Sequence, residues 1–169
     1  MVKRIVWAVV FILIAALLQS TVLSRLALYI RAVPDLALCI LVFSSYVNGT
    51  MTGQLSGFFS GFLLDFLSAA PLGLNALIRT LVGAITGFMK GTFFLDIVFL
   101  PMALCAGATV FKAIAYFLLH LLLAGAVPSY AFLSPVFWIE LGLNTLCAPF
   151  LFAFLKLFEP LLAGQGENA

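Results

Sequence analysis

The chain has 169 residues, of which 65% are hydrophobic and 8% are charged. A soluble domain is about half apolar and about a quarter charged, so this composition excludes a water-facing surface over most of the chain. The formal net charge of +2 is too small to indicate a nucleic-acid partner. The length suits one domain. We therefore expect a single transmembrane domain at 1–163 and a short polar tail at 164–169.

Six apolar segments follow one another along the chain. They cover Ile5–Leu23, Pro34–Val47 (or from near Leu28), Met51–Ala69, Leu74–Gly91, Val98–Gly125 and Phe132–Phe158. A spanning helix needs about 20 residues, so six spans use nearly the whole chain. Lys3 and Arg4 before the first segment also suit a signal peptide, but no clear cleavage site follows, and we interpret it as a retained helix. The sequence predicts an all-α membrane protein, a bundle of about six transmembrane helices.

Basic residues set the expected orientation. Lys3, Arg4, Lys90 and Lys156 fall on one side of the predicted bundle, and Arg25 and Arg31 fall on the other. Because the side richer in Lys and Arg is usually cytoplasmic, both termini are predicted to be cytoplasmic.

Small residues repeat at a spacing of four on the third and fourth segments. The repeats are Gly49, Gly53, Gly57 and Gly61, and then Gly83, Gly87 and Gly91. Glycines at this spacing line one helix face and let two helix backbones approach closely. Reflection of the chain about Leu72 would pair Gly61 with Gly83, Gly57 with Gly87, and Gly53 with Gly91. The pattern predicts a tightly packed antiparallel helix pair.

Ionisable residues occur inside or at the edge of the predicted spans, where they are costly and indicate function by default. Asp65 and Arg79 are predicted to form an ion pair that closes the third and fourth segments into a hairpin. Lys112 and Glu140 either meet across the bundle or each face water in a cavity. Asn144 lies one helical turn beyond Glu140 and is expected to join that cluster.

No catalytic or metal-binding motif is present in the sequence. It contains no HExxH, no Gly-x-Ser-x-Gly and no phosphate-binding loop, and Cys39, Cys105 and Cys147 each lie within an apolar run without a CxxC partner. The single histidine, His120, is a poor metal site by itself. We predict no enzyme activity and no cofactor.

Several ordered motifs resemble those of the MreD family of bacterial rod shape-determining membrane proteins. The motifs are Gln19-Ser20-Thr21, Pro34-Asp35-Leu36, Gly53-x-x-x-Gly57-Phe58, Gly61-Phe62-Leu63-Leu64-Asp65 and Pro71-Leu72-Gly73-Leu74-Asn75. The resemblance implies a multi-pass protein of the bacterial cytoplasmic membrane and a fold similar to the substrate-binding subunits of energy-coupling-factor transporters. It also implies a role in lateral peptidoglycan synthesis with an MreC-like single-span periplasmic protein, an MreB-like filament, and RodA-type and penicillin-binding-protein synthases. Asp35 and Asp65 match motif positions.

Three classes of function remain open at this point. A subunit of the elongation complex would use its outer polar groups, with Arg25, Arg31 and Asp35 as candidate partner contacts. A vitamin-type transporter subunit would need an outward pocket, for which Trp138, His120, Glu140 and Asn144 are available. A membrane enzyme would need ionisable residues clustered at one depth, which the sequence does not indicate. Neighbouring genes would separate the first two classes.

Overall fold

The computed structural model describes residues 2–23, 32–68, 71–91, 98–123, 134–158 and 162. These residues form six α-helices and one π-helical turn, with no strand among them. The elements are α1 (Val2–Leu18), η1 (Gln19–Leu23), α3 (Leu36–Asn48), α4 (Thr50–Leu67), α5 (Leu74–Phe88), α6 (Phe99–Leu122) and α7 (Pro135–Lys156). The predicted all-α class is confirmed. The polar tail and the residues Arg25 and Arg31 lie outside the described part.

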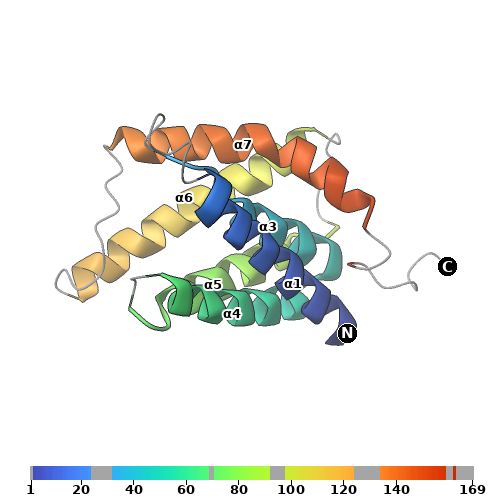
Figure 1. The fold of residues 1–169 in the computed structure, drawn as a ribbon, viewed down its shortest axis with the longest axis horizontal. Helices are drawn as coiled ribbons and strands as arrows, with labels where there is room; N and C mark the ends of the chain where they lie inside the picture. Colours follow the sequence, from blue (N-terminus) through green and yellow to red (C-terminus); the bar gives the residue numbers. More distant parts are fainter. Residues whose placement is uncertain are drawn as a thin grey trace.

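The centre of the bundle is α3, which packs against α1, α4, α5, α6 and α7. In Figure 1, the α4–α5 pair lies on one side of it and the α6–α7 pair on the other. All residues from Ala37 to Ser45 are buried. A helix enclosed on every side can be apolar all round, and its 13 residues explain why its segment is short for a membrane span.

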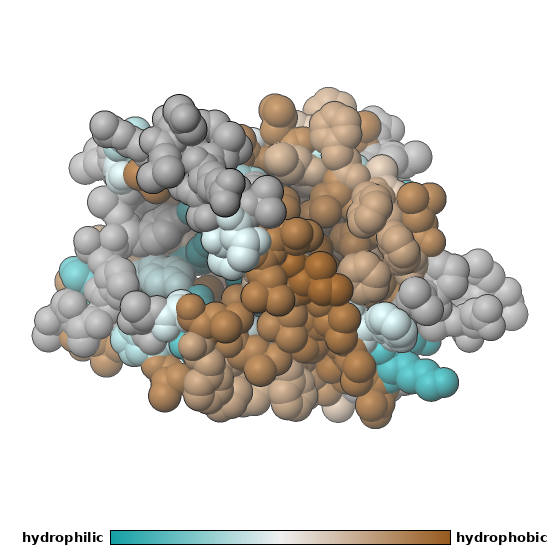
Figure 2. Space-filling model, in the orientation of Figure 1, coloured by the Kyte–Doolittle hydropathy of each residue, from teal (hydrophilic) through white to brown (hydrophobic). Residues whose placement is uncertain are grey.

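The outer helices have the composition of membrane spans. Val2–Thr21, Phe99–Leu122 and Pro135–Lys156 are long and apolar enough to cross a bilayer, and α3 and α5 are shorter apolar helices. Many large apolar side chains are exposed, and brown, hydrophobic residues cover much of the face in Figure 2. Soluble monomers rarely expose such continuous apolar surface. The chain is therefore built to be surrounded by lipid.

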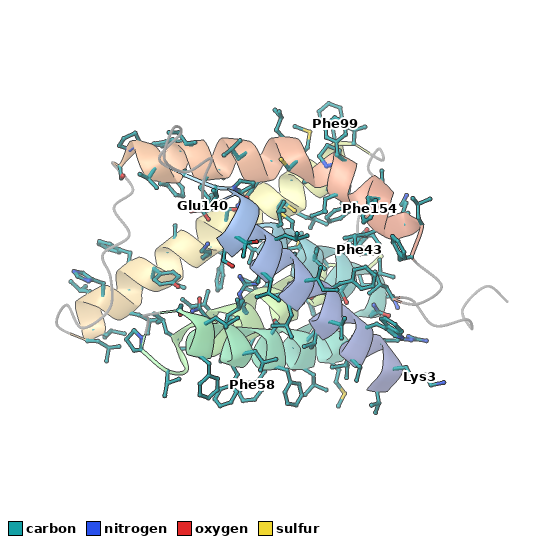
Figure 3. All side chains as sticks on the ribbon, viewed as in Figure 1. Lys3, Phe43, Phe58, Phe99, Glu140 and Phe154 are labelled. Atoms are coloured by element: carbon teal, nitrogen blue, oxygen red, sulfur yellow. The ribbon has the colours of Figure 1, made fainter. Side chains whose placement is uncertain are left out.

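The residue pattern of α4 is the reverse of that of a soluble helix. Its buried face carries small residues such as Ser56, Gly57 and Ser60, whereas Phe58 and Phe66 are 46% and 62% exposed. Figure 3 shows Phe58 pointing away from the bundle. Membrane helices pack through small residues because lipid already solvates the large apolar ones. The small residues of α4 thus mark the face that packs against the bundle.

The α4–α5 contact is a close approach of two backbones. A Cβ atom added to Gly53 would overlap the backbone of Gly83, and one added to Gly57 would overlap the backbone of Arg79. Gly61 likewise lies against Asn75 and Ala76. Substitution at any of the three glycines would force the helices apart.

The register of this contact corrects the one predicted by reflection about Leu72. Gly53 faces Gly83 and not Gly91, and Gly87 faces Gly49 and Thr50. Gly91 follows α5 with a φ of 72° and has no neighbour for an added Cβ among the described atoms. The reflection assumed that both helices end together at a tight turn. Instead, Gly61 of α4 faces Asn75 and Ala76 at the start of α5, and α4 then continues for more than one turn, to Leu67.

Candidate functional site: a buried charge network

Asp35 lies where the apolar helix α3 begins. Pro34 precedes it. The Oδ1 atom of Asp35 accepts a hydrogen bond of 3.0 Å from the amide of Leu38, as the side chain of an N-cap residue does. The residue is 5% exposed. Capping alone needs a carboxylate or hydroxyl at this position but does not require that it be buried. The burial is explained by the cations from two other helices.

Arg79 of α5 and Lys112 of α6 both reach Asp35. Arg79 Nη2 lies 3.1 Å from Asp35 Oδ1, and Lys112 Nζ lies 2.7 Å from Asp35 Oδ2. Charge-assisted hydrogen bonds of this kind are roughly twice as strong as neutral ones. Asp35 therefore ties α3 to both α5 and α6.

Lys112 also bonds to α7, because its Nζ lies 2.8 Å from Glu140 Oε1. Asn144, one turn further along α7, accepts a 2.7 Å hydrogen bond from the Asp35 amide through Oδ1. Its Nδ2 donates to Thr109 Oγ1 on α6 at 2.9 Å. The structure thus brings Lys112, Glu140 and Asn144 together across the bundle, as one of the two sequence-based alternatives proposed.

The four charged side chains sum to zero. Asp35, Arg79 and Glu140 are each less than 10% exposed, and the Lys112 side chain is 16% exposed. An uncompensated charge in this interior would cost several kcal/mol or more. We call Asp35, Arg79, Lys112 and Glu140 the charge network. Its four members come from the start of α3 and from α5, α6 and α7.

Asp65 has a different role from the one predicted. Its two carboxylate oxygens accept hydrogen bonds from the amides of Gly73, Asn75 and Ala76 at 2.9, 2.9 and 3.2 Å. They therefore cap the N-terminus of α5, where the helix dipole also favours a negative charge. The predicted Asp65–Arg79 ion pair is wrong, since Arg79 pairs with Asp35. This capping also holds the start of α5 beside Asp65 and so sets the observed register.

Asp35 was expected to be a partner contact at the outer surface. The structure corrects this, because both oxygens of its side chain are engaged inside the bundle. The sequence did hold one signal, a Pro-Asp-Leu start before an apolar helix, which indicates an N-cap. Nothing in the spacing along the chain indicates that Asp35 meets Arg79 and Lys112, 44 and 77 residues away.

A cavity of about 440 Å³ lies beside the charge network, between α1 with η1, α3, α4 and α5. Its polar lining comprises Gln19, Ser20, Asp35, Ser68, Asn75 and Arg79, and its apolar lining comprises Ala16, Leu17, Val33, Ala37, Leu64 and Leu67. It is distinct from the pocket that Trp138 and His120 were predicted to line. A second cavity, of about 320 Å³, lies between α5 and α6 and is almost wholly apolar.

The described ranges contain no group of three His, Cys, Asp or Glu residues placed to hold a metal ion. The three cysteines are free, with Cys39 and Cys105 buried and Cys147 partly buried. We therefore take the charge network and the adjoining cavity as the candidate functional site.

Fold and site together define a helical membrane protein with a buried charge network whose four charges sum to zero. Residues 1–158 match the family described as rod shape-determining protein MreD, and the chain belongs to that family. No curated protein and no solved structure matches it, so the expected likeness to energy-coupling-factor subunits stays a prediction. Membership in the family implies a role in determining rod shape.

Proposed function

We propose that this chain is a non-catalytic membrane subunit of the cell-elongation complex. In this role it binds an MreC-like single-span periplasmic protein and helps to organise lateral peptidoglycan synthesis. The observation that carries the proposal is the family match, which extends over residues 1–158 and so over every described helix.

The geometry of the charge network supports a structural role for its residues. A catalytic acid or base needs access to a substrate and a pKa suited to proton transfer. Asp35, by contrast, is 5% exposed and is held by two cations and an amide. Such a group stabilises the arrangement of helices around α3. A subunit that binds a partner requires such a fixed arrangement of its membrane helices.

The orientation belongs to the same proposal. Figure 1 shows that α1 begins and α7 ends on the same side of the view. Lys3 and Lys156 lie near those helix ends, and Lys90 follows the end of α5 close to Gly49. By the positive-inside rule this side faces the cytoplasm. The start of α3 and the α4–α5 connection then face outward, where a periplasmic partner is available.

Affinity purification from mild detergent tests the partner proposal. The tagged chain is expected to copurify with a protein that has one membrane span and a periplasmic coiled coil. A tagged multi-pass protein of unrelated function, expressed at the same level, is the control. Isolation of the chain alone, together with normal cell shape after its deletion, would contradict the proposal.

A further inference from the structure

The 440 Å³ cavity has the size of a small-molecule site, for which the usual range is about 300–1,000 Å³. Six of its twelve lining residues are polar and six are apolar, and most of the lining surface is apolar. Leu17, Leu64 and Leu67 supply apolar wall, whereas Gln19, Ser20 and Asn75 supply hydrogen-bonding groups. A lining divided in this way fits a molecule with a polar head and an apolar chain.

An unsatisfied donor adds an independent reason to expect a ligand. Arg79 lines the cavity and is 7% exposed, and its Nη1 has no hydrogen-bond acceptor among the described residues. Its other terminal nitrogen, Nη2, is bonded to Asp35. A buried donor without an acceptor destabilises the folded protein. An oxygen atom entering the cavity would relieve that destabilisation.

The wall formed by η1 is also unusual. Gln19 and Ser20 belong to a π-helical turn of five residues that follows α1 directly. Turns of this type are rare and are frequently found at functional sites. Ser20 is exposed and its hydroxyl bonds to the Leu17 carbonyl. A side chain at this position therefore lies at the mouth of the cavity.

The surrounding charges favour an uncharged oxygen. The charge network is neutral, and the nearby Asp65 is a further negative charge that caps α5. Asp35 lines the cavity and already neutralises the guanidinium, so an anion near Arg79 would be repelled by this carboxylate. A carbonyl or hydroxyl oxygen can accept from Nη1 without that repulsion.

We infer that this cavity binds the uncharged polar head of a membrane amphiphile, with Arg79 Nη1 donating to a head-group oxygen. The apolar chain lies against Leu17, Leu64 and Leu67. This inference goes beyond the proposed function, because partner binding does not require a bound lipid and failure of either leaves the other intact.

Photolabelling of the full-length chain tests the inference. The chain is reconstituted in phosphatidylcholine nanodiscs that contain a monoacylglycerol with a diazirine in its acyl chain. The label is expected on peptides that contain Leu17, Leu64 or Leu67. Unlabelled monoacylglycerol should compete, and phosphatidylglycerol, which carries a negative charge, should compete at least tenfold less well.

Matched variants fill one cavity or the other. Ser20→Trp and Ser68→Trp place an indole at the mouth from opposite walls, at exposed positions, and each should reduce labelling about tenfold. Ala103→Trp fills the apolar cavity between α5 and α6 and should leave labelling unchanged. Thermal melts of each variant identify any that fail to fold. If one of the two mouth variants fails to fold, the labelling of the other one tests the inference. Equal labelling of wild type and a folded mouth variant, label on other helices, or equal competition by phosphatidylglycerol would overturn the inference.

Discussion

Asp35 is the member of the charge network that both caps α3 and pairs with two cations, Arg79 and Lys112. Glu140 has Lys112 as its ion-pair partner. Removal of Asp35 therefore takes away the counter-ion of Arg79 and leaves Lys112 with Glu140. Removal of Glu140, by contrast, leaves both cations paired with Asp35. The two carboxylates are similarly buried, so they form a matched comparison.

The first prediction compares Asp35→Asn with Glu140→Gln. Asp35→Asn should lower the free energy of unfolding by about 3–5 kcal/mol, the usual cost of breaking a buried ion pair. Glu140→Gln should cost about 1–3 kcal/mol, because it removes one negative charge while Lys112 keeps Asp35 as its counter-ion. Denaturant or thermal unfolding in detergent measures both values. A larger loss for Glu140→Gln would show that Asp35 is not the centre of the network.

The second prediction concerns the partner of Arg79. A double-mutant cycle of Asp35→Asn with Arg79→Gln should give a coupling energy of about 0.5–3 kcal/mol, as residues in contact do. The cycle of Asp65→Asn with Arg79→Gln should give less than about 0.5 kcal/mol. Asp65→Ala alone should still cost about 0.5–2 kcal/mol, because the cap of α5 is lost. Strong coupling of Asp65 to Arg79 would restore the ion pair expected from the sequence.

The sequence indicated part of this site. Lys112, Glu140 and Asn144 stand out as polar residues in apolar helices, and the spacing of Glu140 and Asn144 on α7 predicts that these two share one face. Asp35 and Arg79 were assigned to other partners because sequence distance gives no information on contacts between helices. The sequence did not indicate the role of Asp65, because most of the hydrogen bonds that it accepts come from backbone amides, which every residue type except proline carries.

At the scale of helices, the α4–α5 pair depends on the absence of side chains at its contact. The glycine repeats predict that two helices approach closely, and the structure shows such an approach at Gly53, Gly57 and Gly83. The repeat does not determine which residues of α4 and α5 face each other. If α5 is shifted by eight residues relative to α4, glycine or small residues again lie on the contact face. The cap at Asp65 determines the register instead.

The third prediction compares Gly57→Ala with Gly107→Ala. A methyl group at position 57 would overlap the Arg79 backbone, whereas one at position 107 on α6 has open space. Gly57→Ala should therefore destabilise the protein by about 1–3 kcal/mol through overpacking. Gly107→Ala should be neutral or stabilise by up to about 1 kcal/mol, because alanine favours helix. Equal melting temperatures for the two variants would show that α4 and α5 do not touch at Gly57.

At the scale of the whole molecule, the bundle is organised around the short helix α3, which is buried from Ala37 to Ser45 and contacts five other helices. Long helices α1, α6 and α7 and the hairpin α4–α5 surround α3. Composition alone predicted the membrane class, because 8% charged residues cannot cover a water-facing surface. It could not predict that one of the six segments is central, since central and lipid-facing helices are both apolar.

The fourth prediction concerns sidedness. If both termini are cytoplasmic, a green fluorescent protein fused after Ala169 should fluoresce and alkaline phosphatase fused there should be inactive. Alkaline phosphatase fused after Leu123, at the end of α6, should be active. The reverse pattern would invert the bundle and place the start of α3 on the cytoplasmic side.

Cell shape after replacement of the chromosomal copy tests the central claim most directly, namely that this MreD-family bundle acts in rod shape through a body held together by its charge network. Depletion of the chain should turn rods into rounded cells, and the length-to-width ratio measures this. Wild type and Gly107→Ala should restore rods, and Asp35→Asn should not. The account would be contradicted if cells stayed rod-shaped after complete depletion of the chain. It would also be contradicted if Asp35→Asn restored rods as well as wild type does.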